Sequence, residues 1–362
     1  MFTKTKVCIS IDTEFSIGGA FTDTRNVPIA EKRVWCDVDG KSEGLGFLLD
    51  CLARNRITAT FFVEALQQHY FKNDPMAPIA QRLHAAGHEV QLHVHPCWNM
   101  FQHEDWKDRI RKTRGVDTFF GRDEDESVAL IKNGMAIFAG WGIPAPTVFR
   151  SASLQHDAAL YRATARAGIP YSSNIGLAIF DSGDPDYKLY GGRHMRHGVI
   201  ECPVLTFSDW DMFGKQHLKT LTITGTSFAE TRTLLERAHR AGIEQVVILT
   251  HPFEYVQCGD FTMRQIRRNR LNQRRLNQVC AYLDQHRDLF DTCGIGAAAG
   301  MPLKTASANN SLLKGRLGQA LVRMAGQYAY DRYGKWRLDA MARKSVAPSV
   351  APDLAKTAAE TV

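Results

Sequence analysis

A helical pattern leads into a short strand-like run twice in succession, in residues 47–66 (FLLDCLARNRITATFFVEAL) and again in residues 79–96 (IAQRLHAAGHEVQLHVHP). The same rhythm of β-branched run, turn and helical pattern extends over the first 260 residues. Such alternation is typical of parallel strands that are joined by helical crossovers. The sequence therefore predicts an α/β fold with a mainly parallel sheet.

Six runs have the length and composition expected of strands, at residues 7–11, 59–63, 89–92, 147–149, 199–203 and 246–250. Helical patterns lie between them, at residues 43–54, 78–86, 127–140, 158–167 and 228–241. Gly87, Gly142, Gly168 and Gly242 each follow a helical pattern, where a left-handed cap favours glycine. The spacing of these elements leaves little of the first 260 residues for long loops.

The composition is that of a globular protein. The chain has 362 residues, of which 44% are hydrophobic and 23% charged, so it can bury a large core. Its 28 Gly and 13 Pro are ordinary numbers, which excludes collagen-like and low-complexity classes. At about 150 residues per domain the length allows two domains, or one large α/β domain with an appendage.

The sequence lacks the signals of secretion and of membrane insertion. No run reaches the roughly 18 to 20 uninterrupted apolar residues of a membrane span. The N-terminal MFTKTKVCISIDTEF passes from two lysines directly into a strand-like run without an apolar signal core, so we expect a cytoplasmic protein. The eight cysteines are scattered without a CxxC pair, so we expect neither disulfides nor a zinc finger.

The segment after residue 300 has a different character. Residues 301–362 hold ten Lys and Arg against four acids, which is +6 of the net charge of +7. Residues 312–341 have the pattern of a basic, broadly amphipathic helix, and an Ala, Pro, Val and Ser composition follows it. We therefore expect a main domain over 1–300, a helical extension over 301–343 and a disordered tail over 344–362.

An acidic pair, Asp12 and Glu14, follows the first predicted strand in the stretch SIDTEF. The two residues are two positions apart, so on an extended chain both carboxylates face the same way. One carboxylate can then hold a metal ion while the other remains free as a base. Taken alone, an ordinary acidic pair at a strand end is the more common interpretation.

Imidazoles gather in the stretch GHEVQLHVHPCW (87–98). His93 and His95 can both point at one ion, because they are two positions apart at the end of a strand, and neutral imidazole is a common zinc ligand. The alternative for this pair is a satisfied polar cluster. Cys97 is a further candidate ligand or a buried thiol, and His88, at the other end of the strand, is interpreted as structural.

Two further strand ends carry a charged or titratable side chain. Arg150 in TVFRSAS could hold a catalytic carboxylate in its ionised form through a charge-assisted hydrogen bond. His251 ends the apolar run VVILTHPFE, where a histidine opposite a metal suits general acid catalysis. Each signal is weak alone, since Arg150 could also be a surface residue.

Taken together, residues 6–294 resemble the polysaccharide deacetylase family, also called the NodB-homology domain, in the motifs quoted above and in their order. The resemblance implies a distorted (β/α) barrel of about seven parallel strands. It also implies a metal-dependent carbohydrate N-deacetylase, with Zn²⁺ or another divalent metal, that removes acetyl groups from N-acetylated sugars.

The first two family motifs supply the metal site. SIDTE matches the first motif, which gives Asp12 the role of catalytic base and Glu14 that of the metal carboxylate. GHEVQLH places His93 on the first metal histidine. The second family histidine lies four positions further on, where this chain has Cys97, so His95 or Cys97 must take its place.

The remaining motifs supply the other catalytic residues. FRSAS gives Arg150 the role of orienting the base, and LTHP gives His251 that of general acid. TFSDW resembles the fourth motif, which assigns Asp209 and Trp210 to support of the acyl pocket and of Arg150. The implied chemistry is metal-assisted amide hydrolysis, with a backbone donor near Ser151 stabilising the oxyanion.

A cytoplasmic location would favour a nucleotide-linked or lipid-linked N-acylated sugar, a precursor of a surface polysaccharide, over a cell-wall polymer. An arginine cluster supports an anionic substrate, because on a helix several of its members align and could bind phosphate. A solvated basic face is the alternative. The cluster is Arg264, Arg267, Arg268, Arg270, Arg274 and Arg275.

The C-terminal helix carries Tyr328, Tyr330, Tyr333 and Trp336, so it could lie on an anionic membrane as a peripheral contact or pack back on the barrel. Nucleic acid is a disfavoured partner, because no recognition motif accompanies the basic segment. Two other functions remain open: a catalytically impaired, glycan-binding member of the same fold, and a deformylase of a lipid-linked amino sugar.

Overall fold

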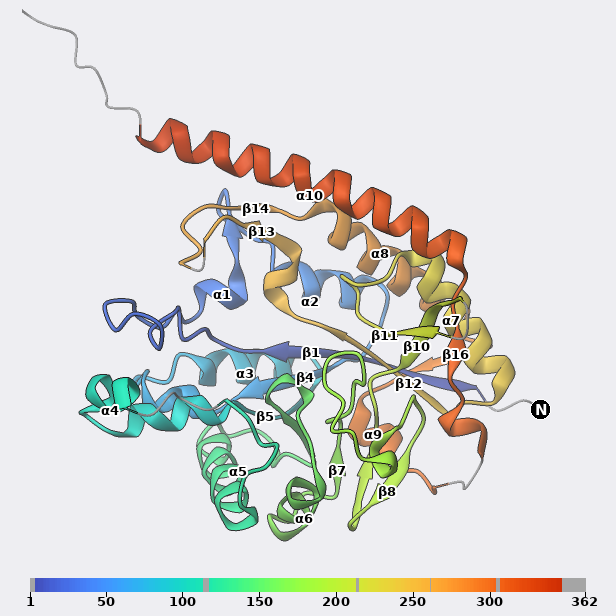
Figure 1. Cartoon of the computed structure of the whole chain (residues 1–362), viewed down its shortest axis with the longest axis horizontal. Coiled ribbons are helices and arrows are strands. Elements are labelled where there is room, and N and C mark those ends of the chain that lie inside the picture. Colours follow the sequence, from blue (N-terminus) through green and yellow to red (C-terminus); the bar gives the residue numbers. More distant parts are fainter. Residues whose placement is uncertain (1–3, 113–116, 213–214, 261, 304–306, 347–362) are drawn as a thin grey trace, which may run out of the picture.

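The computed structural model describes residues 4–112, 117–212, 215–260, 262–303 and 307–346 (Figure 1). Its centre is a curled sheet of nine strands, and seven of these form a continuous parallel series in the order β12-β1-β4-β5-β6-β7-β9. The predicted distorted barrel of parallel strands is confirmed. The seven strands are β1 (Thr5–Thr13), β4 (Thr60–Glu64), β5 (Glu89–Val94), β6 (Val148–Ser151), β7 (Tyr171–Ser172), β9 (Val199–Glu201) and β12 (Gln245–Thr250).

The sheet curls far enough for its two ends to approach each other. The chain beyond β9 returns to β12 through single parallel bridges, from Val204 to Val247 and from Thr222 to Leu249. Two further strands complete the sheet: β8 (His194–Arg196) lies antiparallel on β9, and β15 (Phe290–Thr292) lies parallel to the first residues of β1. The predicted strand runs all fall on β-strands of this sheet.

Helices cover the outside of the sheet, and they occupy the predicted helical segments. They are α2 (Leu45–Arg54), α3 (Met76–Ala85), α5 (Glu124–Ala139), α6 (Ala158–Arg166), α7 (Phe228–Ala241) and α8 (Arg270–Gln285). Ser227 and Glu230 form a reciprocal capping box at the start of α7, and Gly242 ends it with φ +76°. This is the left-handed conformation that favours glycine, as the sequence predicted.

Side-chain alternation along β1 separates two apolar layers. Val7, Ile9 and Ile11 belong to the large core under the helices, whereas Cys8 belongs to a smaller cluster inside the barrel. Successive side chains of a strand point to opposite faces, so the residues in register with Cys8 also point inward. Polar side chains at Ser10 and Asp12 therefore continue the barrel interior toward the carboxyl ends of the strands.

The remaining elements are short, apart from one helix. The last helix, α10 (Leu317–Val346), confirms the predicted helical extension, although it begins later than expected and continues past residue 341. Residues 347–362 of the predicted tail lie outside the described residues. The short elements are α1 (Lys32–Trp35), α4 (Trp106–Lys112), α9 (Ile295–Ala299), β2 (Asp37–Val38), β3 (Lys41–Ser42), β10 (Thr206–Met212), β11 (Lys215–Thr220), β13 (Val256–Cys258), β14 (Ile266–Arg268) and β16 (Leu313–Lys314), with six single turns of 3₁₀ helix.

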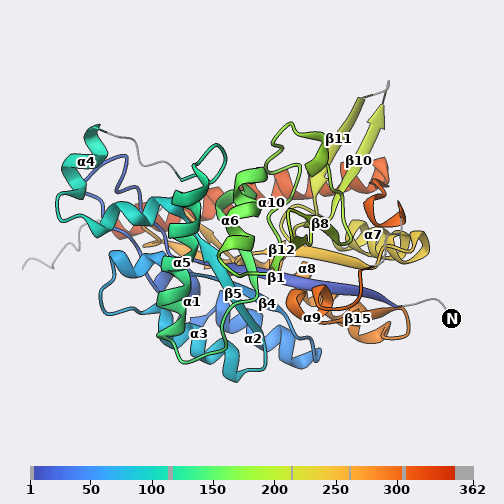
Figure 2. The same ribbon diagram turned by 90° about the horizontal axis from the view of Figure 1, so that it is seen from below.

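The hairpin of β10 and β11 extends from the barrel, as Figure 2 shows at the upper right, and α10 packs against it. Among the described residues, no helix combines the length and the apolarity that a membrane span requires.

The prediction that the arginine cluster lies on one helix is wrong. Arg267 and Arg268 lie on β14, because the side chain of Asn269 accepts the N–H of Asn272 and starts α8 only at Arg270. Arg275 is buried and donates to the carbonyl oxygen of Thr224. The cluster is therefore divided between a strand and a helix, and one member serves the core.

Candidate metal and catalytic site

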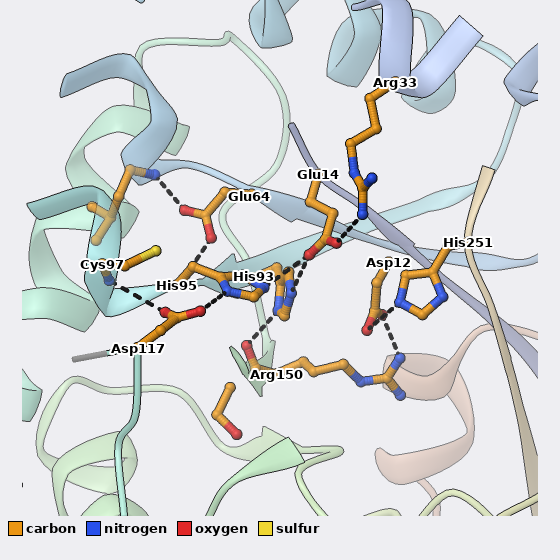
Figure 3. Close-up of polar contacts among 12 residues, drawn as sticks. Asp12, Glu14, Arg33, Glu64, His93, His95, Cys97, Asp117, Arg150 and His251 are labelled. Carbon is orange, nitrogen blue, oxygen red and sulfur yellow. Dashed lines mark hydrogen bonds and ion pairs between the residues drawn. The ribbon is translucent and has the colours of Figure 1, made fainter. Parts of the chain in front are cut away.

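The predicted site residues converge at the carboxyl ends of β1, β5, β6 and β12 (Figure 3). Alternation along the strands explains the convergence. Asp12 and Glu14 share the inward parity of Cys8, and His93 is followed at the same parity by His95. The parallel register then sets His93 of β5 directly beside Arg150 of β6.

Glu14, His93 and His95 form a compact group of potential ligands. One oxygen of the Glu14 carboxylate lies 2.8 Å from Nε2 of His95 and 3.5 Å from Nε2 of His93. The ligand atoms of the three residues all lie within 4.8 Å of one another. Two imidazoles and one carboxylate are a donor set that catalytic zinc sites use, with a coordination position left for water or substrate.

The other ring nitrogen of each histidine has a hydrogen-bond partner that fixes the ring. Nδ1 of His93 lies 2.9 Å from the carbonyl oxygen of Arg150, and Nδ1 of His95 lies 2.7 Å from a carboxylate oxygen of Asp117. Because both partners accept, each Nδ1 carries the hydrogen. Each Nε2 is thereby directed toward Glu14 as a ligand atom, which is the usual arrangement of metal-binding histidines. The residues present fit a divalent cation.

The charges around Glu14 favour its ionised form. Burial alone would raise the pKa of Glu14, but the neighbouring imidazoles of His95 and His93 lower it well below its usual value. The Arg33 guanidinium, 3.5 Å from the second carboxylate oxygen, adds a positive charge on the other side. A carboxylate that is held ionised is the form that binds metal.

Cys97, the alternative third ligand, lies on the opposite side of His95. It belongs to a second group of potential ligands with Asp117 and Nδ1 or Nε2 of His95, and its backbone N–H donates to Asp117. Burial raises the pKa of the Cys97 thiol to about 12. Because a thiol binds metal as the thiolate, this geometry supports His95 over Cys97 as the partner of Glu14 and His93.

Asp12 forms a buried ion pair with Arg150 beside the metal-ligand group. Nη1 of Arg150 lies 2.6 Å from Oδ1 of Asp12, and the Arg150 side chain is fully buried. The remaining guanidinium hydrogens of Arg150 reach the Ser10 hydroxyl and both the carbonyl and the hydroxyl of Ser173. The guanidinium also lies over the ring of Phe62, 4.0 Å from its centre. Arg150 is therefore fixed in place, and it holds Asp12 at the mouth of the barrel.

His251 lies on the other side of Asp12. Its Nε2 is 3.9 Å from Oδ2 of Asp12, and its Nδ1 is 3.1 Å from the carboxylate of Glu254. Burial alone would lower the pKa of His251, but Glu254, with Asp12 and Glu14, raises it to about 9. The imidazole is thus protonated near neutral pH and oriented by Glu254, as a general acid requires.

Two of the predicted site residues serve other parts of the molecule in this structure. Asp209 is buried on β10 and bonds to His217 and to Arg323 of α10, and none of the contacts described above for Arg150 involves it. Trp210 stacks on the ring of His217, with 5.4 Å between the ring centres.

Ser151 is next to Arg150, but its hydrogen-bonding groups already have protein partners. Its backbone N–H donates to Oδ1 of Asn174 at 2.8 Å, and its hydroxyl donates to the carbonyl of Gln155 at 2.6 Å. The backbone donor that the sequence analysis expected near Ser151 is therefore engaged at Ser151 itself.

The structure adds three residues that the sequence analysis did not identify. Glu64, at the end of β4, is fully buried and accepts the backbone N–H groups of Leu66 and His95, and burial raises its pKa to about 8. Asp117 and Glu254 orient the two histidines. Glu254 stands in the same stretch as His251 and could have been found there, whereas Asp117 lies in a loop without a recognisable pattern.

No protein-family model matches the chain, and no curated protein matches its sequence. Solved structures do match its fold. A Mycobacterium smegmatis protein assigned as a polysaccharide deacetylase shares 16% identity, with a TM-score of 0.46, over 83% of this chain and 90% of that one. A family 4 carbohydrate esterase from Streptomyces lividans shares 13% identity, with a TM-score of 0.38, over 80% and 91%.

A mutant of a family 4 pseudoenzyme with restored enzymatic activity also matches, at 11% identity and a TM-score of 0.40, over 83% of this chain and 69% of that one. At such low identities and TM-scores these similarities do not assign an activity to the chain. The residues and distances of the site carry that argument.

Proposed function

We propose that this protein is a metal-dependent hydrolase that removes an N-acetyl group, or another N-acyl group, from a sugar. The observation that carries the proposal is the convergence of three functions at one barrel mouth. A ligand group of Glu14, His93 and His95 lies beside Asp12, which is paired with Arg150, and beside His251, which is paired with Glu254. Amide hydrolysis requires such a set, namely a Lewis acid, a base and an acid.

The side chains have separate tasks in this mechanism. A divalent cation, Zn²⁺ or a similar metal, would polarise the acyl carbonyl and lower the pKa of a bound water when held by Glu14, His93 and His95. Asp12 accepts the proton of the attacking water, and the Arg150 guanidinium at 2.6 Å holds its carboxylate in place. His251 gives its Nε2 proton to the departing amine nitrogen, and Glu254 stabilises the imidazolium before that transfer.

We further propose that the acylated sugar is linked to a nucleotide or a lipid phosphate. Support comes from the strand pair β13–β14, which follows His251 in the chain from Val256 onward. Arg264 and Arg268 are exposed in this segment, and Arg270 follows at the start of α8. Guanidinium groups bind phosphate bidentately, so a carrier phosphate would find partners near this side of the barrel.

Product analysis tests the proposed reaction. Purified protein loaded with zinc should release acetate from N-acetylated sugar nucleotides or lipid-linked sugars, and chelation should abolish the release until zinc is restored. Formate in place of acetate would identify a deformylase and keep the mechanism. Binding of N-acylated sugars without release of either acid, in zinc-reconstituted protein, would instead indicate a glycan-binding protein and contradict the proposal.

A further inference from the structure

The long C-terminal helix α10 leaves one of its faces uncovered. Twelve large hydrophobic side chains are exposed in the described part of the chain, and seven of them lie on this helix. We call these seven the outer face of α10; they are Leu317, Leu321, Val322, Met324, Tyr328, Tyr333 and Trp336, with exposed fractions from 43% to 75%. Soluble surfaces rarely gather so many apolar side chains on one element without a partner.

The opposite face of α10 holds the helix on the barrel. Ala320 and Leu338 are buried, and Gly334 packs so closely that a Cβ there would lie 2.4 Å from the side chain of Gln257. Arg323 donates to both Asp209 and Glu230, each at 3.0 Å. The helix is therefore docked in a defined orientation, and its outer face points away from α8 and β14 (Figure 1).

The chemistry of the outer face matches an anionic lipid surface. Tyr328, Tyr333 and Trp336 are the aromatic types that prefer the boundary between lipid headgroups and acyl chains. Exposed basic side chains lie among them: Arg332 extends its guanidinium over the ring of Tyr328, and Lys335 and Arg337 flank Trp336.

Charge complementarity distinguishes this occupant from a second copy of the chain. Residues 301–362 carry ten basic and four acidic residues, so two such segments facing each other would repel. An anionic bilayer attracts the same segment, at about 1 kcal/mol per basic residue near the surface. The basic residues that oppose self-association thus favour binding to acidic lipid.

We propose that the outer face of α10 docks the protein on an anionic membrane surface, with the helix lying in the plane of the headgroups. This inference does not depend on the proposed hydrolase activity, because the outer face contains none of the residues of the metal and catalytic site. It applies to an enzyme and to a binding protein alike.

Vesicle flotation tests the inference with matched exposed positions. The full-length protein should float with phosphatidylcholine vesicles that contain phosphatidylglycerol and much less with phosphatidylcholine alone. Leu321→Gln combined with Trp336→Gln should weaken the partition at least about tenfold, because two apolar anchors are lost. Ile179→Gln combined with Met195→Gln is the control, since these residues are exposed to a similar extent, 46% and 49%, outside α10.

Three outcomes would overturn the inference. The wild-type protein could fail to bind the anionic vesicles, or the Leu321→Gln/Trp336→Gln variant could bind as tightly as the control. Alternatively, sedimentation could show a wild-type dimer that this variant converts to monomers, which would assign the outer face to a second copy of the chain. Asp12→Asn should bind vesicles as the wild type does, so a failed membrane test and a failed activity test are distinguishable.

Discussion

Replacing Asp12 by Asn is expected to lower the rate of N-acyl hydrolysis by about 10²- to 10⁴-fold, the range for loss of a general base. The amide keeps the size of the carboxylate and an oxygen for Arg150, 2.6 Å away, but it cannot take the proton of the attacking water. Metal content should be unchanged, because Asp12 is outside the ligand group of Glu14, His93 and His95. Rates of product release and zinc content, measured on the same preparation, check both parts.

The control for this prediction is Asp291→Asn. Asp291 pairs with Lys6 of β1 at the end of the strand far from the site, so this variant also removes one carboxylate from an ion pair with β1. Its activity should be close to that of the wild type. Equal activity of Asp12→Asn and Asp291→Asn would mean that Asp12 is not the base.

Replacing Arg150 by Met is expected to lower the free energy of unfolding by about 3 to 5 kcal/mol, the cost of removing one partner from a buried ion pair. Arg150 is fully buried and is the partner of Asp12, which is 5% exposed. The double variant Arg150→Met/Asp12→Asn should recover part of that loss, because no carboxylate is then left without its counter-charge. Urea unfolding of the two single variants and the double variant measures this coupling.

Arg166→Met is the matched control for Arg150→Met. Arg166 also pairs with carboxylates, those of Glu124 and Asp125, but its side chain is 50% exposed. Its replacement should leave the urea midpoint close to that of the wild type, since exposed ion pairs contribute little. A midpoint for Arg150→Met that matches the one for Arg166→Met would contradict the role of Arg150 in supporting Asp12.

The sequence was sufficient for the barrel strands with a long apolar signal. Both faces of β1 are buried, and the apolar run that this requires is visible in the sequence. β7 has only two residues, Tyr171–Ser172, and no periodicity can be recognised over that length. The hairpin β10–β11 was missed because its residues alternate weakly and pack on α10, a contact that local sequence does not encode.

The site was predictable where one strand carries two functional residues. The two-residue spacing of Asp12 and Glu14, and that of His93 and His95, places each pair on the inward face of its strand. Distant partners left no such pattern. Asp117 comes from a separate loop, and only the folded chain shows that it bonds to His95 and makes this histidine a better candidate ligand than Cys97. Arg150 and Asp12, 138 positions apart, are joined only by the closure of the barrel.

The proposed metal site is tested most directly by elemental analysis of purified protein after zinc reconstitution. The wild type should hold about one zinc per chain, as expected for a single catalytic site. Glu14→Ala, His93→Ala and His95→Ala should each lose it, whereas Cys97→Ala should retain it. Stoichiometric zinc that survives in Glu14→Ala and His93→Ala, or a wild type that binds none, would contradict the account.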